Sequence, residues 1–319
     1  MKQVLLKTLV VCIVVLLLPY ILTLFLSSNK ISQKSIEAMN FNISYERNGR
    51  IEDLDLDTYI MGVVAANMPA GYHVEALKAQ AVIARTYALY NMALLTEEGH
   101  SDETFTTWEL GIPYIDITDM KPYWGATDYT TYYSKIENAV QGTKGQVLVY
   151  KGELALPLFF ETGTGYTRNS IEALNVDIPY LTSVESSQDI TSINYLKISE
   201  YYIPDLINLL NNHFPEAILS DDLFFDEVKV TERDSIGYIK TISLGNLTIT
   251  GEEFAKALGL NSYNFTIEQY NGNVRVVCKG VGHGIGLSQY GSNAMAREGS
   301  LYTDILSRYY IGTEVISLE

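Results

Sequence analysis

The chain has 319 residues, of which 47% are hydrophobic, and it carries a formal charge of −16 at pH 7 from 22 basic and 38 acidic residues. This length suits one large domain or two small ones. The acidic balance argues against nucleic acid as a partner, because nucleic-acid-binding proteins normally present a basic face. Of the two cysteines, Cys12 lies in an apolar N-terminal run and Cys278 lies far from it, so no internal disulfide is expected to brace the fold.

An uncharged apolar run, TLVVCIVVLLLPYILTLFL, follows Lys2 and Lys7 and occupies residues 8–26. Its length is close to the ~20 residues that a helix needs to span a bilayer. The basic residues before it predict a cytoplasmic N-terminus and a body outside. A cleaved signal peptide is the alternative, but the run is long for one and no A-x-A-like site follows. We therefore expect a cytoplasmic segment over 1–7, a membrane anchor over 8–26, a linker over 27–44 and a domain over 45–319.

The first half of the domain is expected to be mainly helical. A short hairpin is predicted over 42–52, turning at Asn48-Gly49, and Asp57 is a plausible N-cap for the helix that follows. A long helix is predicted over 73–95, HVEALKAQAVIARTYALYNMALL, because it lacks Gly and Pro and is rich in Ala and Leu. Residues 95–135 are predicted to be irregular.

From residue 139 onward the pattern changes to strands, with turns at Lys151-Gly152 and at Gly163 to Gly165. Short helices are expected over 203–213 and 250–258, and antiparallel hairpins or a meander over 226–248 and 264–278. This mixture predicts an α+β fold, a single domain of mostly antiparallel strands with packed helices.

Three separated segments hold the distinctive motifs. They are DTYIMGVVAANMPAGYHVEALKAQAVIARTYAL at 57–89, LFFETGTGYTRNSIEALNVDIPYLTSVES at 158–186 and GVGHGIGLSQYGSNAMA at 280–296. In order and spacing they resemble the stage II sporulation protein D family, also known as SpoIID/LytB or amidase-enhancer domains. The resemblance covers roughly residues 45–319.

The resemblance implies a lytic transglycosylase lineage, whose enzymes cut peptidoglycan glycan strands between N-acetylmuramic acid and N-acetylglucosamine without water as the nucleophile. It also implies a place in a membrane-anchored complex with a cell-wall amidase and other sporulation membrane proteins, on strands whose stem peptides the amidase has removed. The expected location is the cell membrane, single pass, with the C-terminal domain outside the cytoplasm, in the space between mother cell and forespore.

One position departs from the family pattern. A lytic transglycosylase can work with one Glu, because the muramic acid's own 6-hydroxyl attacks and a single carboxyl can donate and then accept the proton. In the family that Glu stands directly before Met-Pro, where this chain has Asn67. An amide has no group that titrates near neutral pH. Three readings stay open: a non-catalytic glycan binder or amidase-recruiting scaffold, a substitute acid at Glu161 or Glu75, or a change peculiar to this copy.

The glycine-dense segment 281–299 is expected to bring bare backbone close to a sugar, since glycine permits positive φ and close approach. Ser288 or Gln289 is also expected to cap the helix that follows. The alternative is a tight structural loop that ends in a helix start, with His283 satisfied internally, but the other two motif segments favour the sugar-binding groove. A serine hydrolase built on Ser288 and His283 is disfavoured, because no G-x-S-x-G elbow is present. The predicted substrate-binding residues are Gly163, Gly165, Tyr166, Thr167, His283, Gly284, Gly286, Ser288, Gln289 and Tyr290.

No cofactor or metal is expected. Some family members bind zinc through a His, a Cys and a second His in the region 100–125, and His100 matches the first of these. The following SDETFTTWELGIPYIDITDMKPYWG holds neither Cys nor His, and a zinc site needs three or four ligands. Arg85 is expected to pair with an acidic group in the core, and His73 to lie at the surface.

Overall fold

The computed structural model describes residues 42–47, 50–99 and 104–318. The predicted anchor over 8–26, the turn residues Asn48-Gly49 and His100 lie outside these ranges. Within them, none of the helices combines the length and the apolar character that crossing a bilayer requires.

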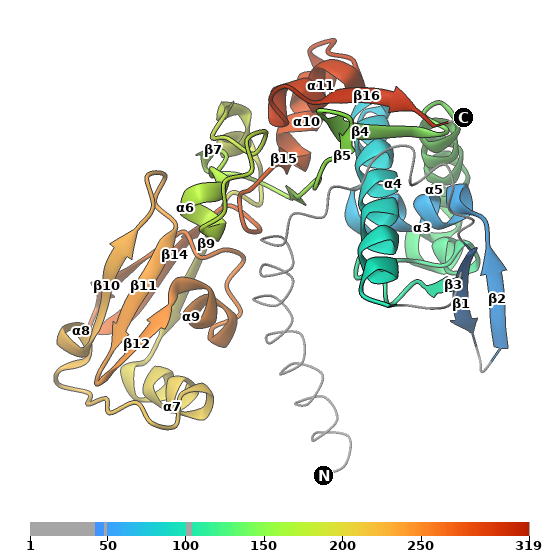
Figure 1. Cartoon of the computed structure of the whole chain (residues 1–319). Helices are drawn as coiled ribbons and strands as arrows, with labels where there is room; N and C mark the ends of the chain where they lie inside the picture. The colour runs from blue at the N-terminus through green and yellow to red at the C-terminus, as the bar shows by residue number, and fades with distance from the viewer. Residues whose placement is uncertain (1–41, 48–49, 100–103, 319) are drawn as a thin grey trace.

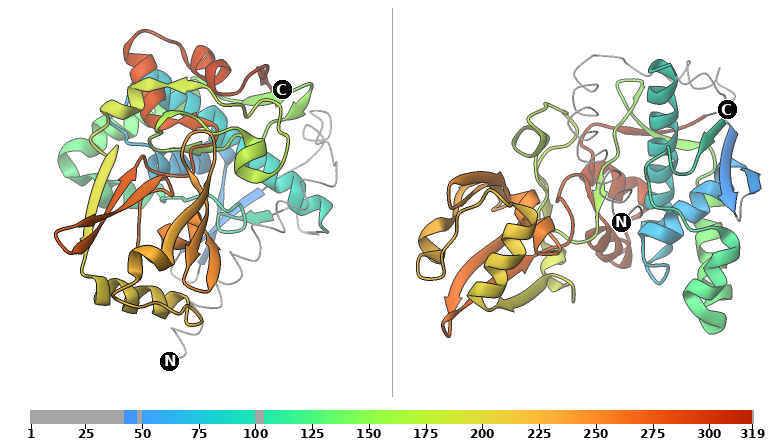
Figure 2. Two further views of the ribbon diagram at one scale, coloured as in Figure 1. Left: turned by 90° about the vertical axis from the view of Figure 1, so that its left-hand side faces the viewer. Right: turned by 90° about the horizontal axis from the view of Figure 1, so that it is seen from below.

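Two separate hydrophobic clusters divide the described chain into two lobes (Figures 1 and 2). The inserted lobe, residues 196–279, interrupts the main lobe, which holds the other described residues. The connecting segments around β7 (Gly165–Tyr166), α6 (Ser170–Leu174) and β15 (Leu287–Ser288) run between the two lobes (Figure 1). The domain predicted as one unit over 45–319 therefore has two cores.

The main lobe is centred on an alanine-rich helix that matches the prediction over 73–95. Its buried alanines, such as Ala79, Ala81 and Ala84, let neighbouring helices pack closely. Around it lie two three-stranded sheets, in the orders β2-β1-β3 and β16-β4-β5. The elements are β1 (Asn42–Arg47), β2 (Arg50–Leu54), α3 (Leu56–Asn67), α4 (Val74–Glu97), β3 (Thr104–Thr106), α5 (Ile117–Gln141), β4 (Gln146–Tyr150), β5 (Glu153–Leu154), α10 (Gln289–Arg297), α11 (Tyr302–Tyr309) and β16 (Glu314–Ser317). Strand β1 thus begins inside the segment predicted as linker.

The start of α3 differs from the prediction. Its N-cap is Asp55, whose Oδ1 accepts a hydrogen bond from the Thr58 amide at 2.9 Å. Asp57 instead turns to the core, where its Oδ1 lies 3.1 Å from Nη2 of Arg85. Arg85 is 1% exposed, so the expected pairing of this arginine with an acidic group in the core is confirmed.

The prediction of irregular structure over 95–135 is wrong from residue 117 onward, where α5 begins. Asp116 caps this helix by accepting a hydrogen bond from the Thr118 amide. A break at Gly125, with φ 77° and ψ 163°, divides the helix. Burial of Met120 and Ile136 stabilises a segment whose many Tyr and Thr residues have modest helix propensity.

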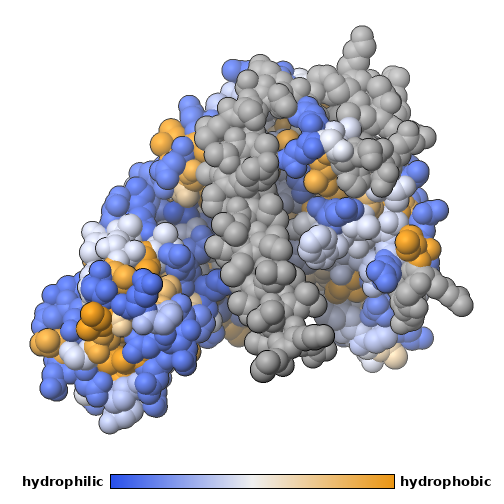
Figure 3. All heavy atoms as spheres, turned by 60° about the horizontal axis from the view of Figure 1, so that its bottom comes forward, coloured by the Kyte–Doolittle hydropathy of each residue, from blue (hydrophilic) through white to orange (hydrophobic). Residues whose placement is uncertain are grey.

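The inserted lobe packs two antiparallel three-stranded sheets, β10-β11-β12 and β13-β14-β9, with three helices. The short helices and antiparallel hairpins predicted for this region are confirmed. Its elements are β9 (Leu196–Tyr201), α7 (Ile203–His213), α8 (Phe224–Glu227), β10 (Val228–Arg233), β11 (Ile239–Leu244), β12 (Leu247–Thr250), α9 (Gly251–Ala257), β13 (Phe265–Tyr270) and β14 (Asn273–Lys279). The molecular face in Figure 3 is mainly hydrophilic, with apolar patches on this lobe.

Short elements connect the lobes. They are β6 (Phe159–Phe160), β7 (Gly165–Tyr166), α6 (Ser170–Leu174), β8 (Glu185–Ser186), the 3-10 helix η1 (Ser187–Thr191) and β15 (Leu287–Ser288). Strands β15 and β6 pair in parallel, as do β1 and β3, whereas the other strand pairs among the described residues are antiparallel. The prediction of an α+β fold with mostly antiparallel strands is confirmed.

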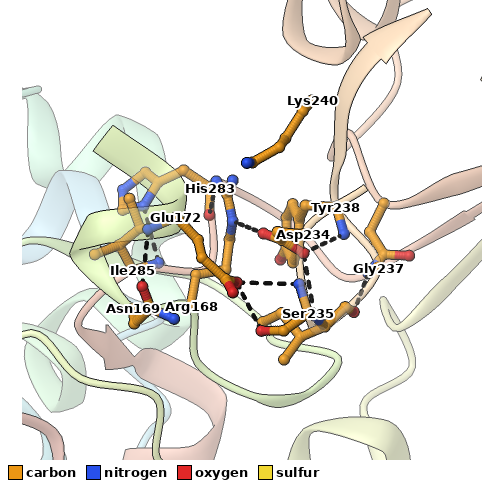
Figure 4. A network of polar contacts seen from close by, with 12 residues as sticks. Arg168, Asn169, Glu172, Asp234, Ser235, Gly237, Tyr238, Lys240, His283 and Ile285 are labelled. Atoms are coloured by element: carbon orange, nitrogen blue, oxygen red, sulfur yellow. Dashed lines mark hydrogen bonds and ion pairs between the residues drawn. The ribbon is translucent and has the colours of Figure 1, made fainter. Parts of the chain in front are cut away.

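A buried ion pair joins the two lobes (Figure 4). Nε of Arg168 in the main lobe lies 2.6 Å from Oδ2 of Asp234 in the inserted lobe, and both side chains are at most 3% exposed. The guanidinium also donates to the Tyr263 hydroxyl at 2.6 Å and lies over the ring of Tyr238. Nη1 of this arginine donates a further hydrogen bond to the His283 carbonyl at 3.2 Å.

Candidate functional site

Asn67 is the last residue of α3, and its side chain is partly exposed. Its Nδ2 donates two hydrogen bonds, to the Val63 carbonyl at 2.7 Å and to the Pro113 carbonyl at 2.9 Å. Both amide hydrogens are therefore used within the protein. The position expected to supply the catalytic proton instead holds a neutral donor tied to two backbone oxygens.

Gln289 links Asn67 to the glycine-dense segment. Its Nε2 donates to the Asn67 carbonyl at 2.8 Å and to Oε1 of the fully buried Gln80 at 3.1 Å. A third hydrogen bond between these segments runs from the His73 amide to Oδ1 of Asn293 at 2.8 Å. These contacts bring together the first and third motif segments.

Glu161 brings the second motif segment to the same place. Its carbonyl accepts a hydrogen bond from the Tyr290 amide at 2.9 Å, and its partly exposed carboxylate accepts one from Asn194 Nδ2 at 2.7 Å. Burial raises the pKa of Tyr72 to about 12, and the nearby charge of Glu161 and the Tyr290 hydroxyl add to this rise. We call Asn67, Tyr72, Glu161, Gln289 and Tyr290 the Asn67 site.

Glu75 is the other candidate for a substitute acid, and both of its carboxylate oxygens are engaged by other groups. One carboxylate oxygen lies 2.7 Å from Nζ of Lys78, and the other accepts a hydrogen bond from the Tyr302 amide at 2.9 Å. Partial burial raises its pKa, but these hydrogen bonds outweigh that effect and the net shift is downward. The arrangement ties the first turn of α4 to the start of α11, and a lowered pKa is opposite to what a general acid needs.

A buried carboxylate that the sequence reasoning missed organises two of the motif loops. Asp189 is 0% exposed and accepts hydrogen bonds from the Ser288 hydroxyl at 2.6 Å and from the Gly163 amide at 2.9 Å. Burial raises its pKa. A Cβ on Gly163 would collide with Oδ2 of Asp189, which explains the glycine there. No local pattern in SSQDITS marks this aspartate, because its partners come from distant segments.

Ser288 is itself fully buried, and its hydroxyl also accepts the Gly291 amide at 3.1 Å as the N-cap of α10. The expected capping role is confirmed. Because the hydroxyl donates to Asp189, Ser288 and His283 form no nucleophile–base pair, and Ser288 has no exposed surface for a ligand.

The glycines of 282–286 pack against the protein's own chain. Gly282, Gly284 and Gly286 have φ values of 100°, 77° and 79°. A Cβ on Gly284 would lie 2.6 Å from the Tyr238 hydroxyl, and one on Gly286 would collide with a backbone carbonyl. These glycines therefore allow a close approach of backbone, and in this structure the groups that they approach belong to the protein's own chain.

His283 is held as a neutral imidazole. Its Nδ1 accepts the Ile285 amide at 3.1 Å, and the ring also hydrogen-bonds the Phe159 backbone. Burial and the neighbouring Arg168 lower its pKa to about 4, although the hydrogen bond to Phe159 opposes that shift. These bonds match the alternative of a tight structural loop, in which His283 is satisfied internally, whereas the prediction that His283 binds substrate stays a prediction.

In the GTGYT loop, only Tyr166 presents a large exposed side chain, at 52%. Gly165 has φ 102°. Thr167 is buried, and its hydroxyl bonds the backbone of residues 182 and 184. Of the predicted side chains, Tyr166 is exposed and Tyr290 is partly exposed, whereas Gln289 is buried at 2% exposure.

Two further observations concern cavities and possible metal ligands. A polar cavity of about 380 Å³ lies between η1 and α11, lined among others by Gln188, Glu298 and Arg308, and none of the predicted site residues lines it. Within the described ranges, no group of three His, Cys, Asp or Glu side chains is arranged to hold a metal ion.

Comparisons with known proteins agree with the three motifs. A family model described as stage II sporulation protein, SpoIID, matches residues 44–150. Stage II sporulation protein D of Bacillus amyloliquefaciens is 33% identical over 84% of this chain and 76% of its own length. The Bacillus subtilis protein of the same name is 30% identical over 99% of this chain and 96% of its own. The Bacillus subtilis amidase enhancer is 28% identical, over 81% of this chain and 40% of its own length.

Proposed function

The chain belongs to the stage II sporulation protein D family, and on that premise we propose that it binds peptidoglycan glycan strands at the Asn67 site without cleaving them. It acts in sporulation and cell-wall remodelling, outside the membrane to which residues 8–26 anchor it. A glycan-bound chain then serves as a scaffold that recruits or stimulates a cell-wall amidase, as the name of the amidase enhancer relative suggests.

The hydrogen bonding of Asn67 carries this proposal. Both amide hydrogens go to backbone carbonyls, and an amide supplies no proton near neutral pH. General acid–base catalysis contributes about 10²–10⁴-fold, so cleavage needs another carboxyl. Asp189 is fully buried and Glu75 has both oxygens engaged. Among these three carboxylates near the motifs, only Glu161 is partly exposed beside the Asn67 site.

The surroundings of Asn67 would suit an acid. Two carbonyl oxygens and the C-terminus of α3 all disfavour a negative charge, and such an environment raises the pKa of a carboxyl. A Glu at this position would therefore stay protonated closer to neutral pH, as a proton donor to a glycosidic oxygen must. The groups around position 67 thus suit a protonated carboxyl, although the residue at this position is an amide.

The test uses the full chain in detergent and its Asn67→Glu variant, with purified peptidoglycan that is either intact or stripped of stem peptides. Sedimentation measures retention on the insoluble glycan, and mass spectrometry detects 1,6-anhydromuramic ends. We expect both proteins to be retained and only Asn67→Glu to form anhydro ends. Glu75→Gln, placed in the Asn67→Glu background, is the matched control and should leave product formation unchanged.

Two results would refute the proposal in different ways. Absence of retention would remove the glycan-binding role. Formation of anhydro ends by the native chain would show that it cleaves, and Glu161→Gln would then identify the acid if it abolished the product.

A further inference from the structure

The polar cavity of about 380 Å³ lies beside η1, at the C-terminal ends of α10 and α11. These two helices lie together in the main lobe (Figure 1). The volume falls within the range of pockets that hold small ligands, about 300–1,000 Å³. One wall is the buried side chain of Tyr309, whose hydroxyl hydrogen-bonds the Ser186 hydroxyl at 2.8 Å. This wall is therefore fixed by the protein itself before any ligand enters.

Arg308 supplies the positive charge of the cavity. Its Nη2 donates a hydrogen bond to the Glu185 carbonyl at 3.0 Å, which holds the guanidinium in place. A guanidinium has five N–H donors, and Arg308 makes no other hydrogen bond and no ion pair among the described residues. Since arginine binds carboxylates through two parallel N–H donors, the remaining donors suit a ligand carboxylate.

Two carboxylates, those of Glu185 and Glu298, line the same cavity. Neither forms an ion pair within the part of the chain that the structure describes, although both share the cavity with Arg308. Glu298 is also the C-cap of α10. The negative end of a helix dipole disfavours a carboxylate there and favours a cation. This side of the cavity therefore suits the ammonium groups of a ligand.

A ligand that complements one guanidinium and two carboxylates carries one carboxylate and two ammonium groups. The neutral polar side chains of Ser187, Gln188 and Ser300 also line the cavity, and they suit a peptide amide, which offers one donor and one acceptor. We propose that this cavity binds a short basic peptide, with the free C-terminal carboxylate on Arg308 and the ammonium groups at Glu298 and Glu185. The binding site is separate from the Asn67 site and does not depend on glycan binding.

The test uses the dipeptide alanyl-lysine, which has these charges, and alanyl-lysine amide, which lacks only the carboxylate. Calorimetric titration of the full chain in detergent measures both affinities. We expect the native chain to bind alanyl-lysine about tenfold more tightly than the amide, as charge-assisted hydrogen bonds allow. Arg308→Gln should bind the two dipeptides equally, and as weakly as the native chain binds the amide. Arg308→Lys, which keeps the charge, should keep part of the preference.

Three further variants separate the cavity from general effects. Glu298→Gln should weaken the binding of both dipeptides by about the same factor, because both carry the ammonium groups, and its side chain makes no hydrogen bond among the described residues that folding could require. Arg297→Gln is the matched control, since this neighbouring arginine does not line the cavity, and it should bind as the native chain does. Asn67→Glu should also bind as the native chain does, whatever its effect on glycan.

Several results would overturn the inference. They are equal affinity of the native chain for the two dipeptides, an unchanged preference in Arg308→Gln, unchanged binding in Glu298→Gln, and no measurable binding of alanyl-lysine at millimolar concentration. Free lysine carries the same charges without the peptide amide, so tighter binding of lysine than of alanyl-lysine would overturn the assignment to a peptide.

Discussion

The buried ion pair between Arg168 and Asp234 allows a prediction about the free energy of unfolding. In Asp234→Asn, the buried guanidinium of Arg168 loses its counter-charge, while the remaining carbonyl oxygen can still accept the Tyr238 amide that Asp234 Oδ1 accepts at 2.8 Å. Removing one partner of a buried ion pair costs about 3–5 kcal/mol, because the other charge stays buried without compensation. We expect Asp234→Asn to lower the free energy of unfolding by an amount in this range.

Guanidinium denaturation followed by tryptophan fluorescence and far-UV circular dichroism measures this cost, with the two signals reported separately because two cores can unfold in separate steps. Arg168→Met and the double variant complete a mutant cycle. Since Arg168→Met removes the stranded charge, the double variant should cost less than the sum of the two single changes by about 0.5–3 kcal/mol.

A surface pair provides the matched control. Lys229 and Asp226 lie 2.9 Å apart, with side chains 55% and 75% exposed. Asp226→Asn should cost no more than about 1 kcal/mol, as exposed pairs do. If Asp234→Asn cost as little as this control, or if the cycle were strictly additive, the reasoning that a buried charge pair couples the lobes would be refuted.

Three other changes have defined outcomes. Gly286→Ala should lower the free energy of unfolding by about 3 kcal/mol or more, because the new Cβ would collide with a backbone carbonyl at a residue of positive φ. The control Gly152→Ala has φ 80° but open space around it, so it should cost only about 1 kcal/mol in the same denaturation experiment. Because the pKa of His283 falls from 6.5 to about 4 on folding, the unfolded state binds more protons between these values. Stability should fall by at most about 3 kcal/mol as pH drops from 6.5 to 4, and His283→Asn should flatten that profile. Asn67→Glu should lower stability by about 1–2 kcal/mol in denaturation at neutral pH, since two carbonyls lose their donor, and an unchanged midpoint would contradict this role of the amide.

The sequence predicted what depends on local pattern. The helix over 73–95 follows from its alanine and leucine content, and the hairpins of the inserted lobe follow from alternating residues between turns. The mistaken cap at Asp57 shows the limit of such reasoning, because three aspartates in DLDLD can each cap a helix. Asp57 pairs with Arg85 in the core, which leaves Asp55 as the cap, and this ion pair becomes apparent only in the three-dimensional structure.

The candidate site was only partly predictable for the same reason. The motifs identified Asn67, Glu161 and Gln289, and the structure places them together. Asp189 lacks any motif of its own, since its hydrogen-bond donors come from residues far away in the chain. The division into two cores was equally invisible, because both lobes share the composition of an ordinary α+β domain.

The state of Asn67 connects these observations to function. An ionised carboxylate at the end of α3 would face the Val63 and Pro113 carbonyls, whereas the amide donates to both. A carboxylic acid at position 67 would therefore be destabilised, when ionised, by the same oxygens that favour its protonated form. Under the proposed function, the amide at this position stabilises the fold at the expense of catalysis, which is a common trade between stability and activity. The glycines and Asp189 that hold the motif loops do not depend on that acid. Under the proposed function, an amide at position 67 beside these loops is the arrangement of a chain that binds the glycan strand without cleaving it.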